Sequence, residues 1–211
     1  FFTNRNFLYL TGIHQEQSVL LMRKKGDQIS ERIFVNKPNL EQEVWTGRRL
    51  TEAEIHEISG VTDVEDIQNL DREMEGLLSF QHVTTLWLCF DAHASEHSLD
   101  IERTLAKRIQ SRHPHVAIKN TYPLLAAMRT IKTPEEIAVI RKAMRITEAG
   151  IRRMMRVAKP GMMEYQLEAE FDHELAQHGQ RRTAFPSIIA GGGRIFYLHY
   201  ANPMSQIADG E

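Results

Sequence analysis

Short apolar segments and amphipathic ones follow each other along the first half of the chain. Three early segments are rich in the aliphatic and aromatic residues that favour strands, namely FLYLTG (7–12), SVLLMR (18–23) and ERIFV (31–35). The turn-like KKGD at 24–27 separates the second segment from the third. We therefore expect the antiparallel start of a sheet.

A helix with signals at both of its ends comes next. Thr51 stands as an N-cap with Glu54 three residues later, and Gly60 lies just beyond the end, so the pattern predicts a capping box and a glycine stop. Apolar periodicity then indicates, in order, a helix over 66–79, a strand over 84–90, a helix over 98–110 and a strand over 115–120. This alternation favours an α/β domain that ends near Tyr122.

Two longer helices are expected after that domain. Thr133 as N-cap, Pro134 at the first helical position and Glu136 as the closing residue of a capping box predict the start of the first helix. Lys159-Pro160-Gly161 ends it, and a second helix is expected from 164 to the stop at Gly179. The apolar face of the first helix consists of Ile137, Ile140, Met144, Ile151, Met154 and Met155.

A hairpin is expected near the end of the chain. PSIIA (186–190) and RIFYLHY (194–200) flank three glycines, and glycines between two apolar runs are typical of a turn between antiparallel strands. Ile195, Tyr197 and His199 would share one face of such a strand, because side chains alternate along it. From spacing alone, a packed histidine that is satisfied by a backbone carbonyl is favoured over a catalytic one.

Composition and charge narrow the class of partner. The 211 residues are 42% hydrophobic and 26% charged, with a formal net charge of -2 and no basic block, which indicates neither a nucleic acid nor an anionic membrane as partner. No apolar run approaches the roughly 18 residues of a membrane span. Cys89 is the only cysteine, which excludes an internal disulfide and a thiolate-rich metal site and favours a cytoplasmic location.

The candidate chemical motifs in the pattern are weak by themselves. His173 and His178 are five residues apart, which turns them by about 140° on a helix and excludes the zinc-protease motif. The glycines 191–193 lack the spacing of a phosphate-binding loop. A polar, solvated helix entry is favoured over a metal site as the explanation of Asp91, His93, Glu96 and His97.

Five stretches of the chain together are similar to one protein family. They are FFTNRNFLYLTGI (1–13), EVWTGRRL (43–50), MRTIKTPEEIAVIRKAMRIT (128–147), GMMEYQLEAEFDHELAQHG (161–179) and FPSIIAGGGRIFYLHYAN (185–202). In this order they resemble the Xaa-Pro aminopeptidase (aminopeptidase P) family of metallopeptidases, which is related to prolidase, methionine aminopeptidase and creatinase.

The resemblance implies two domains. Residues 1–122 correspond to an α/β domain like the N-domain of creatinase, a mixed sheet with helices, and 123–132 to a linker. Residues 133–211 correspond to the first part of an α+β pita-bread domain, which holds a dinuclear metal site in the family. The first elements of the N-domain are absent, and Asp209-Gly210-Glu211 is similar to the turn before the first metal-binding aspartate. We therefore expect an incomplete stretch of a longer chain.

The activity that the resemblance implies is the release of the N-terminal residue from peptides with proline in second position. The family uses a hydroxide that bridges two divalent metal ions, usually manganese, and binds them through two aspartates, one histidine and two glutamates. None of these ligands is in this sequence, so the stretch alone is expected to be inactive. The resemblance also implies a homodimer or a homotetramer.

Two residues match functional positions of the family. His199 matches a histidine of the LHY motif that lines the active site and hydrogen-bonds substrate or the transition state without binding metal. Trp45 resembles a tryptophan that reaches the active site of a neighbouring subunit in oligomeric members, although packing on its own domain is equally compatible. Two other functions stay open: a non-catalytic binding protein with the pita-bread fold, and a hydrolase similar to prolidase or creatinase.

Overall fold

The computed structural model describes residues 3–90 and 101–211. The chain divides into two compact units, 1–130 and 131–211, and each is described by itself. Within the described ranges, no helix combines the length and the apolar character that a membrane span needs.

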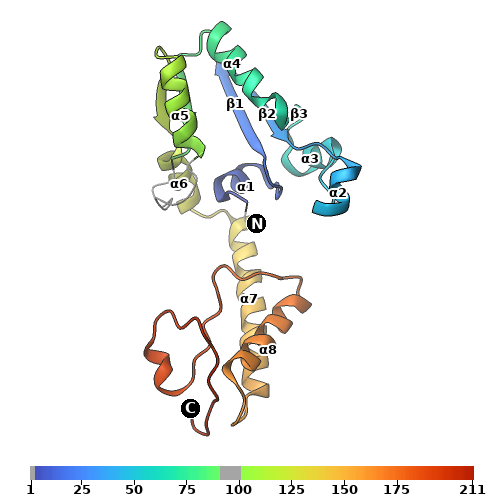
Figure 1. Cartoon of the computed structure of the whole chain (residues 1–211), viewed down its shortest axis with the longest axis vertical. Helices are drawn as coiled ribbons and strands as arrows, with labels where there is room; N and C mark the ends of the chain where they lie inside the picture. Colours follow the sequence, from blue (N-terminus) through green and yellow to red (C-terminus); the bar gives the residue numbers. More distant parts are fainter. Residues whose placement is uncertain (1–2, 91–100) are drawn as a thin grey trace. The chain divides into compact units, whose positions relative to one another are not determined.

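The first unit is built on a three-stranded sheet (Figure 1). β1 (Val19–Lys25) and β2 (Gln28–Val35) form the antiparallel hairpin that the sequence predicts, with a turn at Gly26. β3 (Val64–Asp66) pairs with β2 in parallel and makes β2 the central strand. The last three residues of β2, Ile33, Phe34 and Val35, are all buried. Because successive side chains of a strand point to opposite faces, this end of β2 is covered on both faces of the sheet.

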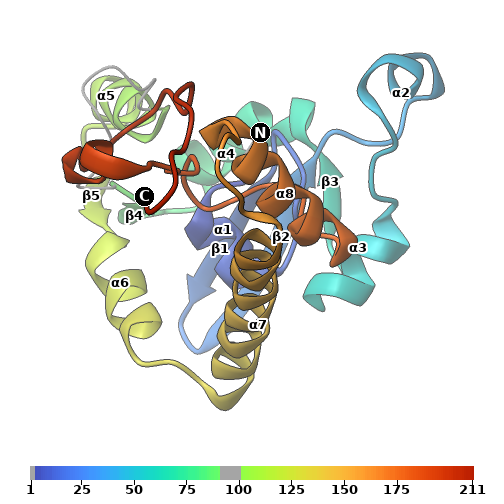
Figure 2. The ribbon, with the colours of Figure 1, turned by 90° about the horizontal axis from the view of Figure 1, so that it is seen from below.

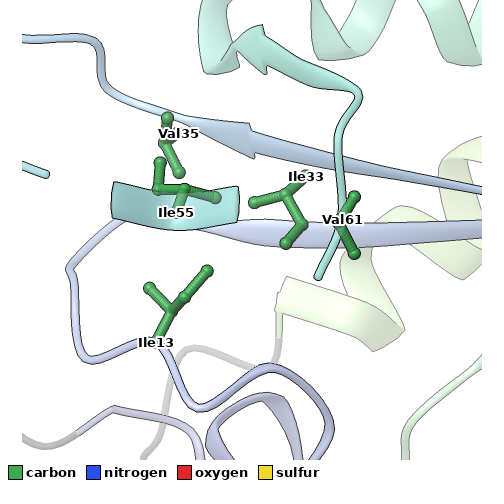
Figure 3. Packing of buried hydrophobic residues seen from close by; sticks show 5 residues of the cluster. All are labelled: Ile13, Ile33, Val35, Ile55 and Val61. Carbon is green, nitrogen blue, oxygen red and sulfur yellow. The ribbon is translucent and has the colours of Figure 1, made fainter. Parts of the chain in front are cut away.

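The main hydrophobic core of this unit lies at the end of β2 (Figure 3). Ile33 and Val35 contribute from the strand, and the other members come from neighbouring segments: Ile13, Ile55 and Val61. Burying a branched aliphatic side chain contributes roughly 1.5–3 kcal/mol, so this cluster supplies a large share of the stability of the unit.

The segment FLYLTG lies in a helix, α1 (Arg5–Thr11), so the strand predicted there is wrong. The side chain of Asn4 accepts hydrogen bonds from the N–H groups of Asn6 and Phe7 at 2.9 and 3.1 Å, which starts the helix. Gly12 ends it in the left-handed conformation. These two cap residues override the strand preference of the aromatic side chains between them.

Two short helices connect β2 to β3. α2 (Leu40–Thr46), which the sequence pattern does not predict, lies at the periphery of the unit (Figures 1 and 2). α3 (Glu52–Ser59) carries the predicted capping box. The backbone N–H of Thr51 donates to the Glu54 carboxylate at 2.9 Å, and the N–H of Glu54 donates to Thr51 Oγ1 at 3.3 Å.

A smaller parallel sheet with its own helices completes the first unit. Its strands are β4 (Thr85–Leu88) and β5 (Ala117–Asn120). The helices are α4 (Leu70–Phe80), which follows the short 3-10 helix η1 (Ile67–Asn69), and α5 (Ile101–Arg112). Buried side chains of α4, of α5 and of the residue just before β5 form a second cluster, made of Leu78, Ile109 and Val116. The predicted α/β class is confirmed for this unit.

Helix α6 (Tyr122–Thr130) covers most of the segment 123–132 that was expected to be a linker. Its Arg129 returns to α1, where Nη1 donates to the Oδ1 atom of Asn6 at 2.7 Å. Asn6 is buried, so this hydrogen bond satisfies a polar group inside the first unit.

Two helices dominate the second unit. α7 (Pro134–Val157) starts at the predicted Thr133 cap, and α8 (Glu164–Gln177) packs against it (Figure 1). Gly150 is buried, and a Cβ atom there would collide with Phe171 and Leu175, so the two helices approach closely at this point. The helical spacing of the apolar residues in α7 is confirmed, but much of that face is exposed here, including Ile137, Ile140, Met144, Ile151 and Met155.

The hairpin predicted over 186–200 is wrong. Residues 131–211 are all described and none of them lies in a strand; Met163 and Gln206 form an isolated bridge. PSIIA is irregular, and residues Gly192–Phe196 form a short 3-10 helix, η2. The backbone amides at both ends of the segment 191–205 bond to a side chain of α8 instead of to another strand.

Candidate functional site

The segment 191–205, the candidate site segment, carries the histidine of the LHY motif. His199 is exposed, and among the described residues no side chain or backbone group is its hydrogen-bond partner. Spacing alone suggested that His199 lies in a strand and is packed. The structure shows neither. An exposed imidazole can both donate and accept a hydrogen bond, which leaves it available to a ligand.

Glu164, the first residue of α8, organises the candidate site segment. Its side chain is fully buried, at 0% exposure. Carboxylate oxygen Oε1 accepts hydrogen bonds from the backbone N–H of Gly191 at 2.9 Å and from Arg194 Nε at 2.6 Å. Oε2 accepts from the hydroxyl of Tyr200 at 2.8 Å and from the backbone N–H of Ser205 at 3.1 Å. All four donors belong to this one segment.

These contacts keep Glu164 ionised. Burial by itself raises the pKa of the carboxyl, but the four donors outweigh burial and lower the pKa from 4.5 to about 2. The carboxylate in turn raises the pKa of the Arg194 guanidinium, which also lies 3.7 Å from the Glu211 carboxylate. The pair is thus a charge-assisted hydrogen bond between two ionised groups.

Backbone hydrogen bonds join the start of α8 and the residues just before it to the end of the candidate site segment and to the chain that follows. The N–H of Glu164 donates to the carbonyl of Ser205 at 2.9 Å. The N–H of Gly161 donates to the carbonyl of Ile207, and the N–H of Ile207 donates to the carbonyl of Met162, each at 2.8 Å. The candidate site segment therefore forms a closed loop with its ends fixed at α8.

Trp45, the second residue predicted to be functional, lies in α2 of the first unit. Its side chain is 87% exposed, and those of Leu40 and Val44 on the same short helix are 84% and 80% exposed. The alternative explanation was that Trp45 packs on its own domain. The exposure of its side chain contradicts this alternative. A large apolar side chain with this exposure is available to another molecule.

The weaker candidates do not form a metal site in the part of the chain that the structure describes. In those residues no group of three or more His, Cys, Asp and Glu side chains is arranged to hold a metal ion. His178 lies near Glu174 at 3.6 Å, and His173 is exposed on α8. The candidate set Asp91, His93, Glu96 and His97 lies outside the described residues.

A cavity of about 280 Å³ lies between α4 and α5 of the first unit. Two pairs of its polar residues contact each other: Arg108 pairs with Asp71 at 2.7 Å, and His113 lies 3.4 Å from Glu75. These internal pairs explain the polar lining as part of the packing of α4 and α5.

Sequence reasoning missed Glu164. An acidic residue in the first turn of a helix is common because it interacts favourably with the helix dipole, and nothing in the pattern separates a buried one from an exposed one. Its four donors lie 27 to 41 residues away along the chain. Only the fold brings them together.

Comparison with known proteins identifies both parts of the chain. Residues 1–87 match the family described as the N-terminal domain of aminopeptidase P, and residues 138–211 match metallopeptidase family M24. The Xaa-Pro aminopeptidase of Escherichia coli K12 is 29% identical over 99% of this chain and 48% of its own length. Human Xaa-Pro aminopeptidase 3 is 28% identical over 100% of this chain and 42% of its own length.

Solved structures agree with these matches. A structure from Bacillus anthracis described as an aminopeptidase P has a TM-score of 0.94 and 33% identity over 100% of this chain and 50% of that one. Zinc-substituted E. coli aminopeptidase P in complex with product has a TM-score of 0.83 and 30% identity over 98% of this chain and 48% of that one.

The chain spans about half the length of the relatives that it matches. Both matched families occur in the expected order, and the similarity to aminopeptidase P runs through both units. The chain therefore contains the aminopeptidase P N-terminal domain, matched over residues 1–87, followed by the start of an M24 pita-bread domain, matched over residues 138–211.

Proposed function

We propose that the protein with this chain is a metal-dependent aminopeptidase that releases the N-terminal residue from peptides with proline in second position. The observation that carries the proposal is the similarity to proteins named Xaa-Pro aminopeptidase over 99% of the chain, in both units. A cytoplasmic location and a homodimeric or homotetrameric assembly are parts of the same proposal.

His199 is proposed as the substrate-side residue. Its imidazole is exposed and has no hydrogen-bond partner among the described residues, while the chain on both sides of it is fixed to α8. A donor held in place before the reaction can stabilise negative charge that develops on a carbonyl oxygen in the transition state. We assign His199 this role and not that of a metal ligand.

Metal binding is assigned to residues other than those described, because the described residues do not fit a metal site. A bound divalent ion lowers the pKa of its water and polarises a carbonyl oxygen, which is the chemistry that the proposed reaction needs. The zinc-substituted E. coli relative supports a divalent metal in this family, and manganese is the ion that we propose here.

Trp45 is proposed to contact the substrate at the active site of a neighbouring subunit. Its 87% exposure in the first unit supports a role outside its own core. The role depends on the proposed oligomer and is tested separately from the role of His199.

The test is hydrolysis by the purified full-length protein of a peptide Xaa-Pro-Xaa, with Xaa-Ala-Xaa as the matched substrate. We expect cleavage only of the proline peptide, loss of cleavage with a chelator and recovery with Mn²⁺. His199→Ala should lower kcat about 100- to 1,000-fold, the loss typical of removing one oxyanion donor. His173→Ala removes an exposed histidine of α8 and should leave kcat unchanged.

Other outcomes separate the alternatives. Cleavage of Xaa-Pro dipeptides alone would replace the proposal with a function similar to that of prolidase. A full-length protein that holds metal but cleaves neither kind of peptide, or one that holds no metal and cleaves nothing, would replace it with a non-catalytic binding protein.

A further inference from the structure

The candidate site segment has little apolar packing to hold it in place. Four successive side chains, Ile195, Phe196, Tyr197 and Leu198, are 62%, 82%, 66% and 87% exposed. Apart from the 3-10 helix η2 the segment is irregular. Its conformation therefore depends on polar contacts more than on burial of side chains.

The contacts that Glu164 makes are distributed along this segment. Gly191 and Ser205, which donate through their backbones, are its two ends, and Arg194 and Tyr200 donate from within it. Tyr200 follows His199 directly, so the bond from its hydroxyl fixes the chain at the neighbouring residue. One carboxylate thus restrains the chain on both sides of His199.

The start of a helix does not explain this arrangement. An acidic residue in the first turn of a helix is favourable when it is exposed, whereas Glu164 is fully buried. Burial of a carboxylate is costly unless paired charges and hydrogen bonds compensate for it. Within the described part of the chain, all the donors to both oxygens come from the candidate site segment, which ties the burial of Glu164 to the conformation of that segment.

We propose that Glu164 is a positioning residue, which holds the candidate site segment so that the chain at His199 stays in one place and presents the imidazole to the substrate. This inference rests on the proposed function for its catalytic consequence. The restraint of the segment by Glu164 stands on the contacts alone. Glu164 touches neither substrate nor metal in this scheme and acts through His199.

The first experiment is a double-mutant cycle in the full-length, metal-loaded enzyme. Glu164→Gln keeps the size of the side chain but places an amide where two of the donors point. We expect kcat to fall by up to about 100-fold with little change in KM, because a small displacement of a catalytic group lowers the rate. Glu170→Gln, on the same helix, removes one of the two carboxylate partners of Arg153 and should leave kcat unchanged.

The double variant Glu164→Gln/His199→Ala separates positioning from general destabilisation. If Glu164 acts through His199, the double variant should be no slower than His199→Ala. Losses that multiply in the double variant would overturn the proposal. Tyr200→Phe removes one of the four donors to Glu164, together with the longer 3.4 Å contact between the Tyr200 hydroxyl and Ser205 Oγ. It is the milder variant if Glu164→Gln does not fold, and it should show the same lack of additivity with His199→Ala.

Hydrogen exchange gives a readout that does not need activity. In Glu164→Gln, amides of residues 191–205 should exchange faster while those of α7 keep their protection. Unchanged exchange in the segment would overturn the inference. If the wild-type enzyme cleaved no Xaa-Pro peptide, the proposed function would fail, and the exchange result would still decide whether Glu164 restrains the segment.

Discussion

Gly150 of α7 lies directly against the ring of Phe171 in α8. A Cβ atom at Gly150 would come within 2.6 Å of Cδ2 of that ring and within 2.8 Å of Cδ1 of Leu175. The two helices therefore approach as closely as they do because residue 150 has no side chain.

Gly150→Ala should destabilise the second unit. Alanine favours the helix by up to about 1 kcal/mol, but overpacking against Phe171 and Leu175 costs roughly 1–3 kcal/mol, so the net effect is a loss. Hydrogen exchange of peptides from α7 and α8 measures this loss of stability, which should appear as faster exchange than in the wild type. Gly76→Ala is the control, because nothing lies within 4 Å of a Cβ there, and this variant should raise the protection of α4.

The two glycines at the start of η2, Gly192 and Gly193, should differ in their tolerance of alanine. Gly192 has φ +54°, and its Cβ would collide with the carboxylate of Glu211, whereas a Cβ at Gly193 meets nothing within 4 Å. Gly192→Ala should cost at least about 1–2 kcal/mol from the left-handed backbone alone, and Gly193→Ala should be close to neutral. Urea unfolding of the two variants compares them, and equal midpoints would contradict this assignment.

Local signals in the sequence were sufficient to predict an element where residues close in sequence supply its hydrogen-bond partners. The capping box of Thr51 and Glu54 and that of Thr133 and Glu136 both form as predicted, because donor and acceptor are three residues apart. The antiparallel pair β1 and β2 follows from a short turn. The missed helix α1 carries equally local cap signals at Asn4 and Gly12, which the aromatic content of the segment obscured.

The candidate site required contacts that are distant in sequence. RIFYLHY has the alternation of a strand, but the carboxylate of Glu164 takes the backbone N–H groups of Gly191 and Ser205 and the side chain of Arg194. No sequence pattern predicts that a glutamate at the start of a helix will accept hydrogen bonds from these donors. The LHY motif singled out His199, whose role as a site residue stays a prediction, and its exposure in this loop emerged only from the fold.

Trp45 should matter for activity and not for stability. Its side chain is 87% exposed, so Trp45→Ala should change the free energy of unfolding by less than about 0.5 kcal/mol. If the proposed contact with a neighbouring active site exists, KM for the proline peptide should rise. Phe80→Ala, at an aromatic residue that is 81% exposed, is the matched control and should leave KM unchanged. An unchanged KM in Trp45→Ala would remove Trp45 from the site.

The stability of the second unit should depend on acid pH through Glu164. The folded state lowers the pKa of this carboxyl from 4.5 to about 2, so its ionised form stabilises the fold. That stabilisation is fully present above about pH 4.5 and is lost as the pH falls toward about 2, because the unfolded chain then binds a proton more readily than the folded one.

Glu164→Gln cannot titrate, so its stability should lack this component of the decline in acid. Both tryptophans lie in the first unit, so tyrosine signals or amide exchange of residues 191–205 should be used to follow the second. Wild type and Glu164→Gln should converge in stability as the pH falls through the window between about 4.5 and about 2. Glu170→Gln keeps the Glu164 carboxyl, so this variant should still lose the stability that the ionised Glu164 contributes as the pH falls. Parallel pH profiles of wild type and Glu164→Gln would show that the four donors do not favour the ionised carboxylate.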